Sequence, residues 1–143
     1  MAKPDPAQLD PERYPFHCTL ATRYGDVDTN RHVNNVALAG MLEDARVRYH
    51  HASGFHASMV GMGAMMGSLT IEFLGQAYYP APLDFHEGAV ALGRTSFQFQ
   101  QLVMQEGRVV ALASSVMICV ADGRPVALPD AFRQSVQAWM ITA

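Results

Sequence analysis

The feature that most constrains the fold is one long helical pattern followed by a long stretch of β pattern. Residues 33 to 53 contain no proline, and apolar residues recur there at spacings of three and four, at Leu38, Met41, Leu42, Ala45, Tyr49 and Ala52. Alanine, glycine and valine on the other sides of this helix indicate that it is wrapped by other elements. The sequence therefore predicts strands that curl around a single helix.

The segments around this helix alternate with the period of two that is typical of strands. Strands are expected over 16–24, 68–74, 83–92, 96–105 and 109–120, with a tight turn at Glu106-Gly107, and a short helix over 129–139. Residues 1–15 carry four prolines and favour an irregular lead-in. We predict an α+β chain with an antiparallel sheet, in which 16–143 form a single domain.

Charge is sparse in this chain of 143 residues, which has the usual length of one domain. Thirteen acidic and ten basic residues give a net charge of −3, without the basic excess that nucleic-acid binding requires. Charged residues make up 16% of the chain and hydrophobic residues 50%. So few charges favour a homo-oligomer that covers part of its apolar surface.

The first residues do not resemble a targeting segment. The chain has no run of 18 apolar residues and no apolar signal-peptide core near its start. We therefore expect a cytoplasmic protein that does not enter membranes. Cys18 and Cys119 are isolated in apolar stretches and are expected to be reduced core residues.

Polar residues crowd between the first strand and the long helix. Asp28, Asn30 and His32 alternate along the segment 23–35, directly before a helix start whose backbone N–H groups lack intrahelical partners. A carboxylate, an amide, an imidazole and free N–H donors are the components of an acyl-transfer site. The segment is therefore the candidate catalytic site.

Other interpretations of this segment involve calcium, zinc or helix capping. An EF-hand loop counted from Asp26 has Arg31 where glycine is needed and Ala37 where a bidentate glutamate is needed, which disfavours calcium. A zinc site built from His32, His50, His51 and His56 lacks suitable spacing. A capping role remains open, with Asn30 or Asn34 bonding the helix N–H groups and Asp28 shaping a turn.

The run Asp28-Thr29-Asn30-Arg31-His32-Val33-Asn34-Asn35 resembles the Asp-x-x-x-His-Val-Asn-Asn signature of hotdog-fold thioesterases. This is the 4-hydroxybenzoyl-CoA thioesterase-like group, which includes the acyl-ACP thioesterases. The order of strand, long helix and four strands also matches over about residues 16–140. The resemblance implies a hotdog fold, in which a curved antiparallel sheet wraps one long central helix and a short C-terminal helix follows.

The resemblance also implies roles for individual residues. Asp28 falls on the catalytic carboxylate, as nucleophile or as general base, and His32 on the histidine that polarises or positions the acyl group. Asn30 is expected to orient Asp28 or the water, and the backbone N–H of Asn35 to bind the oxyanion. Val33 and Asn34 are expected to contact substrate. Residues 45–71 contain no Asp, Glu or Cys, which excludes the layout with its carboxylate further along the chain.

The function expected from the sequence is hydrolysis of a small or medium acyl-CoA or acyl-ACP thioester, without metal or cofactor. The chain length of the acyl group, its aryl or aliphatic nature and the carrier are left open. The resemblance implies a homodimer or a dimer of dimers with the cleft at the dimer interface. The alternative function is a catalytically idle hotdog module that binds acyl thioesters or serves assembly.

Overall fold

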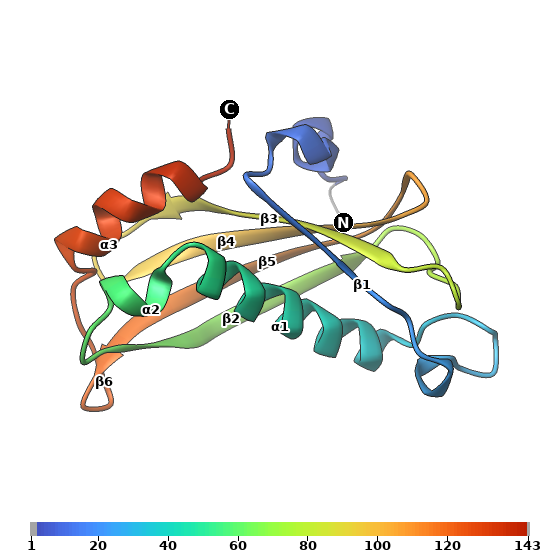
Figure 1. Ribbon diagram of the computed structural model, residues 1–143, viewed down its shortest axis with the longest axis horizontal. Helices are drawn as coiled ribbons and strands as arrows, with labels where there is room; N and C mark the ends of the chain where they lie inside the picture. The colour runs from blue at the N-terminus through green and yellow to red at the C-terminus, as the bar shows by residue number, and fades with distance from the viewer. Residues whose placement is uncertain (1–2, 143) are drawn as a thin grey trace.

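The computed structural model describes residues 3–142, with the side chain of His56 excepted. A short first strand and a long helix are followed by a series of strands and a C-terminal helix (Figure 1). The strands are β1 (Phe16–Leu20), β2 (Gly63–Phe73), β3 (Leu83–Leu92), β4 (Ser96–Gln105), β5 (Arg108–Ala121) and β6 (Arg124–Pro125). The α-helices are α1 (Asn35–Ala52), α2 (Phe55–Ser58) and α3 (Asp130–Ser135).

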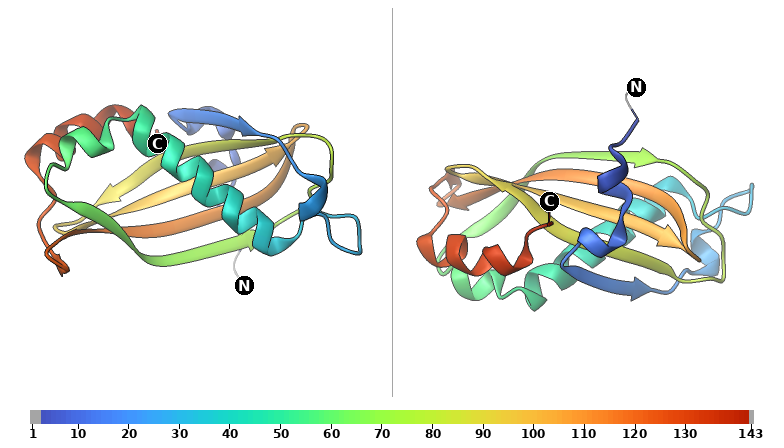
Figure 2. Two further views of the ribbon diagram at one scale, coloured as in Figure 1. Left: turned by 60° about the horizontal axis from the view of Figure 1, so that its bottom comes forward. Right: turned by 90° about the horizontal axis from the view of Figure 1, so that it is seen from above.

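All pairings in the sheet are antiparallel, in the order β1-β3-β4-β5-β2, with β6 paired to β5. The sheet is curved, and α1 lies along its concave face while α2 and α3 gather at one end (Figure 2). This is the predicted α+β arrangement and the one that the hotdog resemblance implies. Within residues 3–142 no helix is long and apolar enough to cross a membrane.

The core lies between α1 and the concave face of the sheet. The helix presents Leu38, Leu42, Ala45 and Tyr49 to the sheet at the predicted spacing, and all four are buried. Inward-facing residues of β1, β3, β4 and β5 meet them because alternate side chains of a strand share one face. They include Leu20, Phe85, Phe97, Phe99, Val103, Ala111 and Ala113.

The lead-in covers the opposite face of the sheet (Figure 2). It forms two short 3₁₀ helices, Pro6–Leu9 and Pro11–Arg13, which Asp5 and Asp10 cap with their side chains. Tyr14 then packs with Leu102 and Leu112 in a small outer core. The prolines thus permit short capped turns, which the composition alone did not predict.

Most predicted elements agree with the structure, but several differ. Strand β2 begins at Gly63 instead of residue 68. The first strand ends at Leu20 instead of residue 24, because Tyr24–Asp26 turn into a 3₁₀ helix. The helix α2 and the two-residue strand β6 were not predicted. The C-terminal helix divides into α3 and a 3₁₀ turn, Val136–Trp139.

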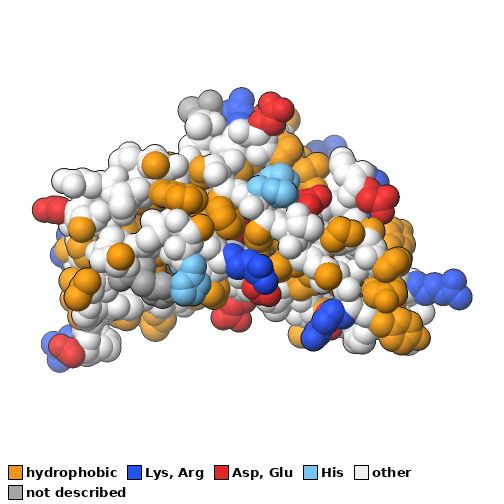
Figure 3. Space-filling model, in the orientation of Figure 1, with side chains coloured by type: hydrophobic (Ala, Val, Ile, Leu, Met, Phe, Trp, Pro, Cys, Tyr) orange, Lys and Arg blue, Asp and Glu red, His pale blue; other side chains and the backbone are white. Residues whose placement is uncertain are grey.

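Strand β2 forms one edge of the sheet and carries exposed apolar side chains. Met65 is 52% exposed, Leu69 39% and Phe73 47%. Charged groups are few and scattered on the face seen in Figure 3, and apolar groups lie between them. An edge strand with this composition is a surface that tends to pair with another chain.

Candidate functional site

The segment between β1 and α1 folds back on itself as a tight loop. The backbone N–H of Asp28 donates to the carbonyl of His32 at 2.8 Å, and that of Arg31 donates to the carbonyl of Asp28 at 3.0 Å. Arg31 occupies the left-handed region, with φ of 66°, which completes the reversal. The loop therefore holds Asp28 and His32 together and places Asn30 at its exposed tip.

The Asp28 side chain is exposed, and within residues 3–142 only its Oδ1 atom accepts hydrogen bonds. Its Oδ1 accepts hydrogen bonds from the backbone N–H groups of Asn30, at 2.8 Å, and His32, at 3.1 Å. The carboxylate opens into a pocket of about 360 Å³ that Tyr24 and Tyr79 also line. These two rings lie edge to face at 5.9 Å, and neither was predicted from the sequence to be part of the site.

His32 is half-buried and lies against the loop that joins β2 to β3. It stands opposite Tyr78 in an isolated antiparallel bridge, and the two rings are 5.2 Å apart. Next to it, the N–H of Val33 donates to the carbonyl of Ala77 at 2.9 Å. A segment about 45 residues further along the chain therefore fixes the position of His32.

The end of the loop forms the start of α1. Asn34 is the N-cap, and its side chain accepts a hydrogen bond from the N–H of Ala37 at 2.7 Å, so the capping role is confirmed for this residue. Asn35 is the first helical residue, and its N–H has no hydrogen-bond acceptor within residues 3–142. Asn35 and the buried Val33 line a second pocket of about 300 Å³.

The structure thus joins some of the predicted residues and separates others. The backbone N–H groups of Asn30 and His32 both donate hydrogen bonds to the Asp28 carboxylate. In the single chain, the Asp28 carboxylate and Asn35 line different pockets. Asn34 uses its side-chain oxygen for the helix cap.

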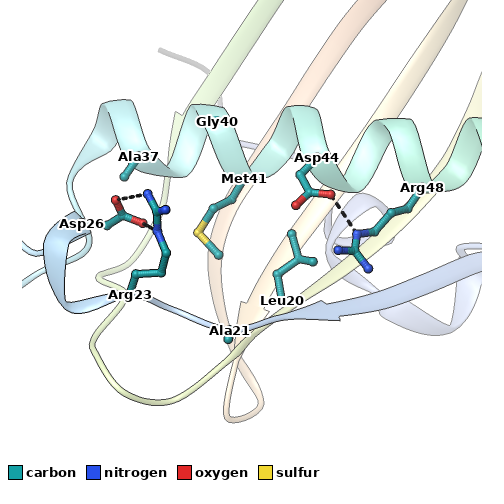
Figure 4. Close-up of a pocket in the computed structure, with 9 residues that line it drawn as sticks. All are labelled: Leu20, Ala21, Arg23, Asp26, Ala37, Gly40, Met41, Asp44 and Arg48. Carbon is teal, nitrogen blue, oxygen red and sulfur yellow. Dashed lines mark hydrogen bonds and ion pairs between the residues drawn. The ribbon is translucent and has the colours of Figure 1, made fainter.

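A groove of about 480 Å³ lies on the β1 side of α1 and shares no lining residue with the Asp28 pocket (Figure 4). Arg23 donates to both carboxylate oxygens of Asp26, at 3.0 and 2.9 Å, and this hydrogen-bonded guanidinium lowers the pKa of Asp26. Asp44 and Arg48 pair at 2.8 Å, as their spacing predicts. These acids stabilise the loop and the helix surface.

A buried polar cluster lies beneath the middle of α1. Glu87 is fully buried on β3, and its Oε1 accepts a hydrogen bond from the side chain of Gln101 at 2.7 Å. Gln101 also donates to the carbonyl of Leu42 and accepts from Arg46 at 3.2 Å. Burial raises the pKa of Glu87 to about 8. The burial of Glu87 was not predicted from the sequence, although alternation along the strand places it on the same inner face as Phe85.

We expect the stability of the protein to decrease between about pH 5 and pH 8. The folded protein keeps the Glu87 proton up to about pH 8, whereas an unfolded glutamate releases it near pH ~4.3, so rising pH favours unfolding across this range. In Glu87→Gln, an isosteric amide replaces the carboxyl group. Thermal unfolding measured from pH 5 to 9 should show a flatter profile for this variant, and equal slopes in both proteins would contradict the assignment.

Metal ligands do not gather within the described part of the chain. No three His, Cys, Asp or Glu side chains there lie close enough to hold a metal ion. The zinc interpretation included His56, whose side chain lies outside the described residues.

Several solved protein structures have a similar fold. The structure resembles the PA5185 protein of Pseudomonas aeruginosa, with a TM-score of 0.80, 24% identity and coverage of 92% of this chain and 96% of that one. It also resembles a Thermus thermophilus thioesterase complexed with coenzyme A and zinc, with a TM-score of 0.78, 25% identity and coverage of 90% and 96%. For a DHNA-CoA thioesterase from Staphylococcus aureus the TM-score is 0.74, the identity 20% and the coverage 86% and 87%.

Sequence comparison identifies the family directly. No curated protein matches the chain. A model of the thioesterase-like superfamily, however, matches residues 22–139, which include the Asp28 loop, all of α1 and the strands β2 to β6. The protein therefore has the hotdog fold and belongs to the thioesterase-like superfamily.

Proposed function

We propose that this protein hydrolyses acyl-CoA thioesters at the loop that carries Asp28 and His32. The observation that carries the proposal is the state of the Asp28 carboxylate. It is exposed, two backbone N–H groups orient it through Oδ1, and Oδ2 has no hydrogen bond within residues 3–142. In a chain of the thioesterase-like superfamily, an oriented carboxylate with one available oxygen supports a role as nucleophile or general base.

In the proposed reaction, Asp28 either attacks the thioester carbonyl carbon or takes a proton from the attacking water. Both routes pass through a tetrahedral oxyanion and expel the thiolate as the C–S bond breaks; on the nucleophilic route, water then hydrolyses the mixed anhydride. The available N–H of Asn35 and the positive end of the α1 dipole are the proposed oxyanion donors. Asn30 and His32 hold the carboxylate and position the acyl group.

The pocket beside Asn35 is the proposed acyl site. Its volume of about 300 Å³ suits a small or medium acyl group, and apolar side chains contribute to its walls, among them Val33, Leu38, Phe73, Leu74 and Val110. Such walls accept aliphatic and aryl groups alike. The coenzyme A bound to the Thermus relative supports CoA as the carrier.

We further propose that the active protein is a homodimer, or a tetramer of two dimers, joined along β2. Pairing of two β2 edges covers the exposed Met65 and Leu69 and satisfies the free backbone groups of the edge. The Asn35 pocket includes Phe73, the last residue of β2, so a partner at this edge borders the acyl site. The dimer is thus the proposed means of completing a cleft that the single chain divides into two pockets.

One observation favours the alternative of a catalytically idle binding module. The Oδ1 atom of Asp28 already serves as the acceptor that shapes the loop, which is a purely structural use of a carboxylate. On this alternative, thioesters bind at the Asn35 pocket without turnover.

A panel of CoA thioesters decides between the two functions. Thiol release from short, medium and aryl thioesters is followed with a thiol reagent, and binding is followed in parallel by thermal unfolding with each compound. The hydrolase proposal predicts turnover of at least one member above the protein-free rate. Stabilisation by thioesters without any thiol release would establish the binding module instead.

Replacement of His32 by alanine is expected to reduce kcat by roughly 10-fold to 100-fold, because a donor and a positioning group are lost while the carboxylate remains. Initial rates on the best substrate of the panel measure the effect. A loss larger than that of an Asp28 variant would show that the two roles are reversed.

A further inference from the structure

Gln105 is the last residue of β4, and its buried side chain faces the loop between β2 and β3 rather than the helix. The side chain is fully buried. Its Oε1 accepts from the backbone N–H of Tyr78 at 2.9 Å, and its Nε2 donates to the carbonyls of Tyr78 at 2.7 Å and Ala81 at 2.9 Å. The amide thus bonds both backbone polar groups of Tyr78, as a neighbouring strand would.

Tyr78 is in turn the residue that stands opposite His32. The two residues form an antiparallel bridge, their rings meet edge to face at 5.2 Å, and the adjacent Val33 N–H is bonded to Ala77. The N–H of His32 then donates to the Asp28 carboxylate at 3.1 Å. A continuous chain of contacts therefore runs from Gln105 through Tyr78 to His32 and Asp28.

Arg108 contacts both Gln105 and the loop between β2 and β3. Its guanidinium lies 5.7 Å from the centre of the Tyr78 ring, donates to the carbonyl of Gln76 at 3.3 Å, and approaches Oε1 of Gln105 at 3.4 Å. Both N–H groups of the Gln105 amide and its oxygen are thus fully used. Asparagine is one methylene shorter, and leucine has the bulk but none of the hydrogen bonds.

We propose that Gln105 is a positioning residue for His32, which it holds against Asp28 through the backbone of Tyr78. The expected effect on catalysis rests on the proposed function, whereas the expected effect on the position of His32 does not. Gln105 itself does not border the Asp28 or the Asn35 pocket. It acts on the site through a backbone segment that a buried amide fixes.

The test uses Gln105→Leu with Gln101→Leu as the matched control. Gln101 is also a buried β4 amide that donates to a backbone carbonyl, but its partners are Leu42 and Glu87, beneath α1. Both substitutions are expected to lower the melting temperature, because each removes hydrogen bonds from buried polar groups. Only Gln105→Leu should disturb His32.

The first readout is the NMR signal of the His32 imidazole, assigned by its absence in His32→Ala. We expect this signal to shift or broaden in Gln105→Leu and to remain in place in Gln101→Leu. An unchanged His32 signal in folded Gln105→Leu overturns the proposal, whether or not the protein hydrolyses any thioester. This readout keeps the proposal separate from the proposed function.

The second readout is a double-mutant cycle in turnover. We expect Gln105→Leu to lower kcat by about 10-fold to 100-fold in the wild-type background and to have little further effect in His32→Ala. Equal losses in both backgrounds would show a structural role independent of His32. Gln105→Asn keeps the amide but is one methylene too short to hold both backbone groups of Tyr78, so it tests the same coupling if Gln105→Leu fails to fold.

Discussion

The double substitution of Met65→Lys and Leu69→Lys is expected to convert the proposed dimer into a monomer and to reduce the proposed thioesterase activity at least ~100-fold. Both side chains are exposed on the edge strand β2, and lysine at a sheet edge prevents pairing with another chain. Neither residue lines the Asp28 or Asn35 pocket, so the loss of activity would follow from the loss of the partner. Light scattering on wild type and variant at micromolar concentration measures the effect.

Val90→Lys is the matched control for this substitution. Val90 is 41% exposed and apolar, but it lies on β3, which does not pair with β2 in the sheet. We expect this variant to keep the dimer and its activity. A wild-type protein that is active as a 15.6 kDa monomer would contradict the proposed assembly and the shared cleft.

The sequence predicted the fold well because its signals are local and periodic. The spacing of Leu38, Leu42 and Tyr49 identified the face of α1 that the sheet covers, and strands β3 and β4 have the predicted bounds. The early end of β1 was not predictable from alternation alone. There the chain leaves the sheet for a 3₁₀ turn that the Arg23–Asp26 ion pair stabilises.

Only part of the candidate site could be inferred in the same way. Asp28 and His32 are four residues apart, so a single loop unites them, and the motif is visible in the sequence. Tyr78 and Tyr79 contact residues of the loop that are about 45 to 55 residues away along the chain, and Gln105 acts on the loop only through Tyr78. Only the pairing of the strands brings such residues together.

The replacement of Asp28 by asparagine is expected to lower kcat at least ~100-fold while the fold is kept. Asparagine retains an oxygen that accepts the hydrogen bonds from the N–H groups of Asn30 and His32, so the loop keeps its shape. The amide is neither a nucleophile nor a base at neutral pH, so the chemical step is lost. Asp26→Asn is the matched control, since this acid lies in the same loop but pairs with Arg23.

The turnover number of Asp28→Asn on the best CoA thioester, measured beside wild type and Asp26→Asn, is the most direct test of the proposed hydrolase. We predict the loss of at least ~100-fold in Asp28→Asn, with an unchanged melting temperature, and only a small change in Asp26→Asn. Near-normal turnover in folded Asp28→Asn would contradict the assignment of Asp28 as the catalytic carboxylate.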